Sequence, residues 1–315
     1  MLPDKPTIAI LGAGAVGGYY GGRLAQHGHD VHFLVRSDYA ALARRGWTIR
    51  SCQGDFSIPP HKLRVYNNVS LMPAADLIII TFKTTSNDQY EPLIQPLLKQ
   101  STLILTLQNG LGNEERLAEL FGAHRVLGGL AFTCINRIEP AVIHHLGQGW
   151  IRVGQFIEGQ TDLAQVVVDL LARCRIQADV VPSLRYGRWE KLLWNIPFSG
   201  LGGALDLTTD QLIGNRWGLH LVTALMQEVI VAARAHGADI PAGMIDEMIR
   251  RTSTMGAYRS SMQIDRQEGR PMEVEAILGE PLRASQRAGV PTPFLAALYP
   301  MAVAVNLGKM RKQNP

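Results

Sequence analysis

The sequence predicts an α/β domain followed by an all-α domain, and three observations support this division. Short β-branched runs alternate with helical patterns through the first half of the chain, which is typical of parallel strands joined by crossover helices. One of these runs leads directly into a glycine-rich turn. Beyond Pro182 and Ser183 the strand patterns disappear and almost every segment has helical periodicity. We therefore expect one domain over residues 1–182 and a second over residues 183–315, a length that accommodates two separate cores.

The first domain is expected to hold a mostly parallel sheet with an antiparallel extension. Strand-sized apolar runs that predict its parallel part occupy residues 7–11, 31–35, 77–82, 103–107 and 126–130. Residues 142–145 and 149–154 alternate in polarity on either side of a glycine-containing turn, which predicts an antiparallel hairpin. An amphipathic helix over residues 163–174 and a last strand over residues 178–181 complete the domain.

The second domain is expected to consist of helices alone. Asn215 is suited to cap a long apolar helix over residues 217–237, and Gly237 is suited to end it in a left-handed conformation. Helical periodicity also covers residues 242–254, 272–288 and 293–309. A homodimer formed through these apolar helices is an open possibility.

The composition excludes several classes of protein. With 46% hydrophobic and 18% charged residues, and with no low-complexity tract or repeat, the chain is neither disordered nor fibrous. A formal net charge of +4, spread along the chain, gives no support for nucleic-acid binding. Three widely separated cysteines, without metal-ligand spacing, indicate a reduced cytoplasmic protein with no metal site: Cys52, Cys134 and Cys174. The N-terminus lacks the pattern of a signal peptide and the apolar runs are of strand length, so we expect no membrane association.

The glycine-rich turn predicts a dinucleotide site of the Rossmann type. An apolar strand over residues 8–11 leads into a GxGxxG pattern, and a helical pattern follows. Gly12 permits the tight turn, Gly14 lets a pyrophosphate approach the backbone, and Gly17 lets the helix pack closely on the strand. The complete turn, which we expect to bind the cofactor, is Gly12, Ala13, Gly14, Ala15, Val16 and Gly17.

The end of the second strand predicts which dinucleotide binds. An NAD-binding domain usually has an acid there for the ribose hydroxyls, whereas this chain has Arg36. A guanidinium pairs with a 2′-phosphate, so NADP(H) is favoured over NAD(H). The alternative is an ordinary surface arginine, and Asp38, two residues further on, counts against the NADP(H) assignment.

Two further polar positions follow predicted strands. Lys83 comes after the third strand and Asn109 after the fourth, at the edge where an open α/β sheet binds ligands. Two interpretations of each stay open. Lys83 contacts the adenosine phosphate or is simply solvated, and Asn109 holds the nicotinamide ribose or the substrate, or caps a turn before Gly110.

In the second domain, Lys191 and Asn195 stand four residues apart and share one helix face. Ser199 lies four residues further, but Pro197 removes a backbone hydrogen bond, so a kink is expected and the direction of Ser199 cannot be extrapolated. By pattern alone Lys191 is a solvated surface lysine, Glu273 an acid in the first turn of its helix, and Ser261 an ordinary loop serine.

These motifs together resemble one family. The segments GAGAVGG, Lys83, QNG, KxxxN, SSM and PMEVE follow one another as in the ketopantoate reductases (2-dehydropantoate 2-reductases), over nearly the whole chain. The resemblance implies a Rossmann domain with a helical domain that closes over the substrate. It also implies the use of NADPH to reduce 2-dehydropantoate, a small-molecule 2-oxo acid, to (R)-pantoate on the route to coenzyme A.

By the same resemblance, Lys191 matches the catalytic lysine and Glu273 the active-site glutamate. Ser261 matches the serine that binds the substrate carboxylate. Asn109 and Asn195 match asparagines near the nicotinamide and the substrate. Each assignment depends on the order of the motifs, since the single motifs are short.

The chain departs from the family pattern at two positions. Ser199 stands where many members have a second asparagine, and Ser86 where a glutamine often follows the Lys83 segment. A serine offers one hydroxyl in place of an amide, which bears on recognition of the terminal hydroxyl of the substrate. The alternatives are a related enzyme that reduces another 2-oxo acid or carbonyl, and a non-catalytic dinucleotide-sensing module.

Overall fold

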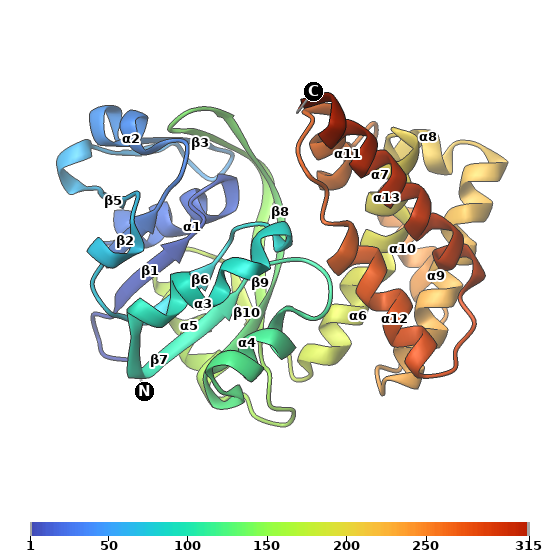
Figure 1. Cartoon of the computed structure of the whole chain (residues 1–315), viewed down its shortest axis with the longest axis horizontal. Coiled ribbons are helices and arrows are strands. Elements are labelled where there is room, and N and C mark those ends of the chain that lie inside the picture. The colour runs from blue at the N-terminus through green and yellow to red at the C-terminus, as the bar shows by residue number, and fades with distance from the viewer. Residues whose placement is uncertain (1, 314–315) are drawn as a thin grey trace. The chain divides into compact units, whose positions relative to one another are not determined.

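A computed structural model describes residues 2–313, and within them the chain forms two compact units. The first unit comprises the residues up to Gln108 together with 113–184, and the second comprises Asn109–Gly112 and the residues from Arg185 onward. Figure 1 shows strands and helices in the first unit and helices alone in the second. The short segment Asn109–Gly112 is therefore separated from the strand that precedes it and packs with the helical unit.

The first unit is built on one mixed, mostly parallel sheet, as the sequence predicts. Its order is β4-β3-β9-β8-β7-β6-β1-β2-β5, with β10 beside β9. Only the β8–β9 and β3–β4 pairs are antiparallel. The strands are β1 (Thr7–Leu11), β2 (Asp30–Leu34), β3 (Trp47–Ser51), β4 (Phe56–Ile58), β5 (Arg64–Tyr66), β6 (Ala75–Ile80), β7 (Leu98–Thr106), β8 (Val126–Glu139), β9 (Val142–Gln155) and β10 (Ala178–Val180).

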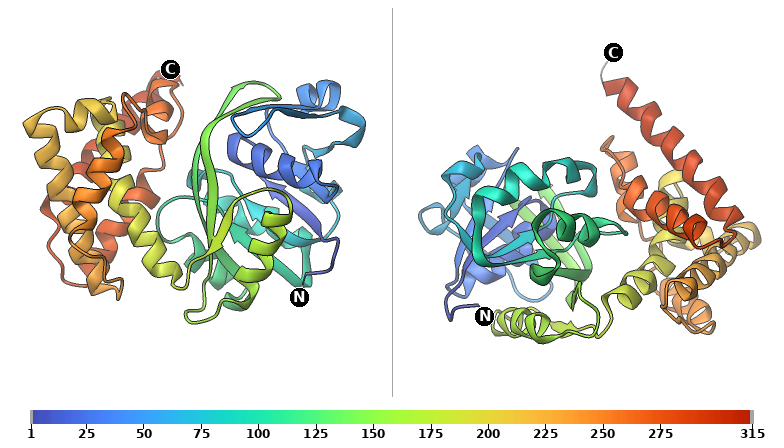
Figure 2. Two further views of the ribbon diagram at one scale, coloured as in Figure 1. Left: turned by 180° about the vertical axis from the view of Figure 1, so that it is seen from behind. Right: turned by 60° about the horizontal axis from the view of Figure 1, so that its bottom comes forward.

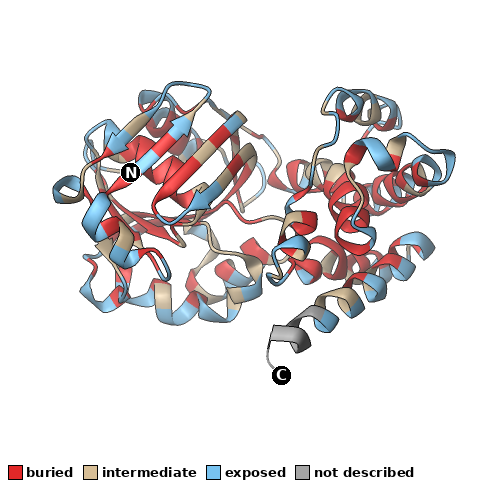
Figure 3. Ribbon diagram, turned by 90° about the horizontal axis from the view of Figure 1, so that it is seen from above, coloured by how far each residue is buried: buried red, intermediate tan, exposed pale blue. Residues whose placement is uncertain are grey.

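Apolar cores lie on both faces of this sheet. Alternate residues of β1 divide between them, because successive side chains of a strand point to opposite faces: Ile8 and Ile10 join one core, and Ala9 and Leu11 join the other. The central strands β1, β2 and β6 are accordingly buried along most of their length, and Figure 3 shows buried (red) segments in the interior of the sheet. The helices of this unit are α1 (Ala15–Gln26), α2 (Tyr39–Arg45), α3 (Tyr90–Ile94), α4 (Asn113–Phe121) and α5 (Asp162–Arg173).

The expected hairpin between residues 142–145 and 149–154 is wrong. Both segments belong to one strand, β9, which pairs with β8 over almost its full length (Figure 2). The chain reverses at Pro140 and Ala141, where Ala141 has a φ of 67°. Gln148 and Gly149 also have positive φ, but they lie at an irregularity in the ladder. The glycines there form a bulge within a strand and not a turn between two strands.

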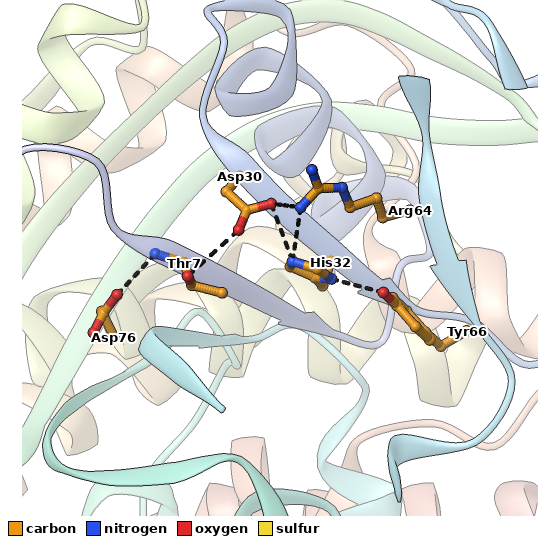
Figure 4. A network of polar contacts seen from close by, with 6 residues as sticks. All are labelled: Thr7, Asp30, His32, Arg64, Tyr66 and Asp76. Atoms are coloured by element: carbon orange, nitrogen blue, oxygen red, sulfur yellow. Dashed lines mark hydrogen bonds and ion pairs between the residues drawn. The ribbon is translucent and has the colours of Figure 1, made fainter. Parts of the chain in front are cut away.

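A polar network joins the first residues of β1 and β2, at the opposite end of these strands from the glycine-rich turn (Figure 4). The carboxylate of Asp30 accepts hydrogen bonds from Thr7 and Arg64. His32 lies between Asp30, at 3.1 Å, and the hydroxyl of Tyr66, at 2.9 Å. Burial lowers the pKa of His32 from its ordinary value.

The second unit packs its helices around a single apolar core. The cap of its long helix is confirmed: the Asn215 side chain accepts the Gly218 N–H at 2.8 Å, and Gly237 follows the helix with a φ of 76°. The helices are α6 (Leu184–Trp194), α7 (Leu201–Leu205), α8 (Thr209–Ile213), α9 (Arg216–Ala235), α10 (Met244–Ser253), α11 (Ser261–Gln267), α12 (Glu280–Arg287) and α13 (Pro293–Gln313).

Helix α9 is long and apolar enough to cross a membrane by length and composition alone. Half of its apolar window is buried inside the protein, where Val222, Leu225 and Met226 join the core of the helical unit. These features are those of a core helix.

Pro197 produces a wide helical turn and not the simple kink that we expected. Residues Asn195–Gly200 form a π-helical segment, η6, between α6 and α7. A second π-helical segment, η7 (Glu275–Gly279), precedes α12 and packs against η6. Because π-helical turns are rare and often lie at functional sites, this pair identifies a region of interest in the second unit.

Candidate active site

The glycine-rich turn of the first unit has the geometry of an anion-binding cradle. Gly12 has a φ of 92°, and a Cβ placed on it would lie 2.4 Å from the backbone nitrogen of Phe82. A Cβ on Gly17 would lie 2.3 Å from the hydroxyl oxygen of Thr81, which itself donates to the carbonyl of Gly12 at 2.8 Å. Both glycines are therefore required by contacts within the protein.

Gly14 differs, because no contact among the described residues explains why it lacks a side chain. A Cβ on Gly14 would meet only the Gly12 carbonyl oxygen, at 3.9 Å. Ala15 and Val16 begin α1, whose first turn has neither a side-chain cap nor an acidic residue. The open space and the first-turn N–H groups fit a pyrophosphate, since helix N-termini attract anions.

Arg36, two residues after the end of β2, lies exposed on the surface and forms no ion pair with the side chains described for residues 2–308. Asp38 is only 3% exposed, and its carboxylate pairs with Arg137 at 2.6 Å and accepts the Ala141 N–H at 3.2 Å. An acid that contacts the ribose hydroxyls of NAD would have to face the cofactor. The side chain of Asp38 is instead committed to the β8–β9 hairpin.

The loops after β6 and β7 are held together by Gln108, whose role the sequence reasoning missed. Its buried amide nitrogen donates to the carbonyl of Phe82 at 2.9 Å and to Asn87 at 2.8 Å. Its amide oxygen accepts from the hydroxyl of Tyr90 at 2.5 Å. Lys83, half-buried, lies directly after Phe82 and precedes the 3-10 helix η3 (Thr84–Gln89). The network therefore fixes the backbone from which Lys83 extends.

The Asn109 loop packs on the second π-helical segment. Gly110 has a φ of 87°, and a Cβ on it would lie 2.1 Å from the backbone oxygen of Ala276. The Leu111 N–H donates to that same oxygen at 2.9 Å. Because Ala276 lies three residues beyond Glu273, these contacts hold the half-buried Asn109 beside the segment that carries Glu273.

Lys191, Asn195 and Ser199 all lie on α6 and η6. Lys191 is half-buried in the last turn of α6, and Asn195 begins the π-helical segment. Asn195 is 7% exposed and Ser199 1% exposed, so both polar groups are enclosed within the helical unit. A half-buried ammonium and two enclosed neutral polar groups can recognise an anionic or carbonyl-containing ligand.

Ser261 and Glu273 lie at the two ends of the segment that runs from α11 to η7. Ser260 caps α11 by accepting the Gln263 N–H at 3.3 Å, so Ser261 is an exposed first residue of the helix. Glu273 is 5% exposed. Between them, the buried carboxylate of Asp265 pairs with Arg270 at 3.0 Å and closes the turn that follows α11.

The outer side of η7 is braced by a separate charged cluster. Tyr299 donates to Glu275 at 2.6 Å, and Arg283 donates to Glu275 at 2.9 Å and to Glu280 at 2.8 Å. The hydrogen bond to Glu275 raises the pKa of Tyr299 above its ordinary value. This cluster fixes the π-helical turn from outside.

Comparison with known families decides what this arrangement belongs to. The family model described as "Ketopantoate reductase PanE/ApbA" matches residues 8–158, and "Ketopantoate reductase PanE/ApbA C terminal" matches residues 183–306. The chain belongs to the ketopantoate reductase family.

Individual relatives agree with the family model. A 2-dehydropantoate 2-reductase of Nostoc sp. is 41% identical over 301 residues, which covers 94% of this chain and 94% of that protein. The crystal structure of a 2-dehydropantoate 2-reductase from Geobacter metallireducens is 43% identical, with a TM-score of 0.91, over 94% of this chain and 99% of that one. A D-mandelate dehydrogenase solved with NADH and anilino(oxo)acetate has a TM-score of 0.88 over 96% of this chain and 99% of that one. At 22% identity, this last likeness shows the fold alone.

Proposed function

We propose that this member of the ketopantoate reductase family reduces 2-dehydropantoate to (R)-pantoate with NADPH. The observation that carries the proposal is the joint presence of an anion-binding glycine turn and a polar set containing Lys191, Asn195 and Glu273. The relatives at 41% and 43% identity, both named 2-dehydropantoate 2-reductases, support the same substrate.

The preference for NADPH is argued from Arg36. A protein of this fold has been solved with NADH, so the fold does not select between the cofactors. Arg36 is exposed two residues after the end of β2, where a 2′-phosphate would lie, and the nearby acid Asp38 is buried and paired. Lys83 adds a second cation, because it directly follows Phe82, whose backbone packs against Gly12 of the glycine-rich turn. The turn itself, from Gly12 to Gly17, would hold the pyrophosphate.

Bound NADPH would supply a hydride to the carbonyl carbon of the 2-oxo acid. As the carbon is reduced, negative charge grows on the carbonyl oxygen, and a positioned cation lowers the energy of that charge. We assign this role to the ammonium of Lys191, which then transfers a proton to the oxygen and completes the alcohol. The product gains one hydride and one proton, and Lys191 is afterwards reprotonated from solvent.

The remaining residues would orient the reactants. Glu273 is proposed to orient Lys191 and to accept a hydrogen bond from the forming hydroxyl. Ser261 would bind the substrate carboxylate, and Asn195 and Asn109 would hold the substrate and the nicotinamide ribose. Ser199 is the group available for the terminal hydroxyl of 2-dehydropantoate.

A second candidate function is the reduction of another 2-oxo acid by the same residues. The observation that favours it is Ser199, which is 1% exposed and shorter than the asparagine typical of the family. A dinucleotide-sensing module without turnover is a third candidate.

The cytoplasmic location and the homodimer stay predictions. Light scattering on the purified protein tests whether it forms a homodimer.

Initial rates of NADPH oxidation test the proposed function. The purified enzyme is assayed with 2-dehydropantoate, with 2-oxoisovalerate, which lacks the terminal hydroxyl, and with pyruvate. The proposal expects the highest kcat/KM for 2-dehydropantoate. A higher value for another acid establishes the second candidate, and NADPH binding without turnover on any acid establishes the third.

A further inference from the structure

The loop after β2 contains a charge arrangement that bears on cofactor preference. Asp38 follows Arg36 by two residues, and a free carboxylate at that place would repel a 2′-phosphate. The carboxylate is nevertheless retained, and it is buried. Burial of an ionised carboxylate is costly unless a partner of opposite charge compensates for it.

The compensating partner comes from β8, which β7, β6 and β1 separate from β2 in the sheet. Arg137, near the end of β8, donates to Asp38 at 2.6 Å and to the hydroxyl of Ser37 at 3.0 Å. Ser37 donates to Asp38 at 3.0 Å, and the Ala141 N–H donates to the other carboxylate oxygen at 3.2 Å. We call these four residues, Ser37, Asp38, Arg137 and Ala141, the hairpin clasp.

The clasp has two consequences for Arg36. It neutralises Asp38, so the exposed guanidinium of Arg36 is the uncompensated charge on this loop. It also ties the loop at Ser37 and Asp38 to the β8–β9 turn, roughly 100 residues away in sequence. We propose that Arg137 determines the preference for NADPH over NADH by neutralising Asp38 and positioning the loop that presents Arg36. This inference rests on the proposed use of NADPH.

Only NADPH carries the phosphate that an uncompensated Asp38 would repel. Removal of the Arg137 charge should therefore weaken NADPH binding and leave NADH binding unchanged. One unit charge acting at about 8 Å through a partly solvated medium changes affinity on the order of tenfold. A clasp that merely stabilised the fold would affect both cofactors equally, because they share every other group.

The test uses Arg137→Met, with dissociation constants for NADPH and NADH measured by cofactor fluorescence. The matched control is Arg45→Met, since Arg45 also anchors the β8–β9 turn, by donating to the carbonyl of Pro140 at 2.6 Å, but from the end of α2. We expect Arg137→Met to weaken NADPH about tenfold and NADH by less than about twofold. We expect Arg45→Met to change neither by more than about twofold. Equal weakening of both cofactors by Arg137→Met, or no weakening of NADPH, overturns the proposal.

A second comparison separates charge neutralisation from direct contact with the phosphate. Asp38→Asn removes the negative charge and keeps an oxygen that can accept the Ala141 N–H. In this background, Arg137→Met should leave the ratio of NADPH to NADH affinity within about twofold of the Asp38→Asn single variant. A persisting loss of NADPH affinity would mean that Arg137 acts through its hydrogen bond to Ser37 or on the phosphate itself, and it overturns the role through the charge of Asp38.

The wild-type measurement distinguishes failure of this inference from failure of the proposed function. If the wild-type protein binds NADH as tightly as NADPH, the proposed cofactor is wrong and the inference falls with it. If the wild type prefers NADPH and Arg137→Met preserves that preference, only the role of Arg137 fails. Retained NADH affinity in each variant shows that its first unit is folded.

Discussion

Gly110→Ala is the substitution that probes most sharply how the Asn109 loop is held. An alanine at a φ of 87° is strained by about 1 kcal/mol, or somewhat more. Its Cβ would also lie 2.1 Å from the backbone oxygen of Ala276, well inside van der Waals contact. Since backbone cannot rotate away, the loop must move and lose the hydrogen bond from Leu111. Overpacking costs about 1–3 kcal/mol and the lost hydrogen bond about 1 kcal/mol, so we expect a total near 4 kcal/mol.

The matched control is Gly28→Ala. Gly28 has nearly the same φ, 86°, but a Cβ on it would meet nothing within 4 Å. This variant should lose only the conformational part, about 1 kcal/mol. Urea unfolding followed by circular dichroism measures both variants, and their difference isolates the contact between the Asn109 loop and η7.

Activity provides the second readout for the same pair. Displacement of the loop by an ångström or more moves Asn109 relative to the segment carrying Glu273, and misplacement on that scale can lower kcat/KM about a hundredfold. Gly28→Ala should keep the wild-type kcat/KM. If Gly110→Ala is as stable and as active as Gly28→Ala, the Asn109 loop is not held by η7 as described.

Three other predictions concern single side chains. Ser199→Ala should raise the KM for 2-dehydropantoate about two- to tenfold, the value of one hydrogen bond, and leave the KM for 2-oxoisovalerate unchanged in steady-state assays. Equal effects on both acids would exclude Ser199 from recognition of the terminal hydroxyl. The Glu228 carboxylate caps the start of α13 by accepting the N–H groups of Phe294 at 2.7 Å and Leu295 at 2.9 Å. Glu228→Ala should therefore lower the free energy of unfolding by about 2 kcal/mol in urea titrations, and unchanged stability would argue against this cap. Because burial lowers the pKa of His32, the unfolded chain takes up a proton below about pH 6.5 that the folded chain does not, so stability should fall as pH drops through that value. His32→Gln should flatten this dependence in urea titrations at pH 7.5 and 5.5, and a variant with the wild-type slope would show that other groups cause it.

Local signals in the sequence predict the features that local geometry decides. The strand–turn–helix context of Gly12 and Gly17 predicts the turn, and Gly12 has the positive φ that this turn requires. The atoms that a Cβ on either glycine would meet on Thr81 and Phe82, just after β6, are not visible in that local pattern. The cap at Asn215 and the left-handed Gly237 are likewise properties of one helix and its ends. In these cases propensity and tertiary structure agree.

Other features depend on residues far apart in sequence. The true β8–β9 turn has no glycine, and Ala141 adopts its positive φ because the paired strands require it, whereas the glycine signal at Gly149 marks a bulge. The strands β3 and β4 pair with each other, and β3 also pairs with β9; at five and three residues, they are too short for their alternation to stand out from the loops around them. The sequence therefore shows neither of them.

The candidate site shows the same limit. Motif order makes Lys191 and Glu273 candidates, but the sequence does not show that the Asn109 loop packs on η7 or that Pro197 lies in a π-helical turn. It also presents Asp38 as an argument against NADPH. The structure removes that argument by showing the carboxylate buried against Arg137.

The proton-donating role of Lys191 is tested most directly by stopped-flow measurement of a single turnover. Wild-type and Lys191→Ala enzymes, each premixed with NADPH, are mixed with 2-dehydropantoate, and the loss of NADPH absorbance is followed. General acid catalysis typically contributes a factor of about 10²–10⁴, so the variant should be at least about a hundredfold slower while its NADPH dissociation constant stays within about twofold of the wild type. A variant that reduces the acid at nearly the wild-type rate would contradict the assignment of Lys191, and with it the proposed mechanism.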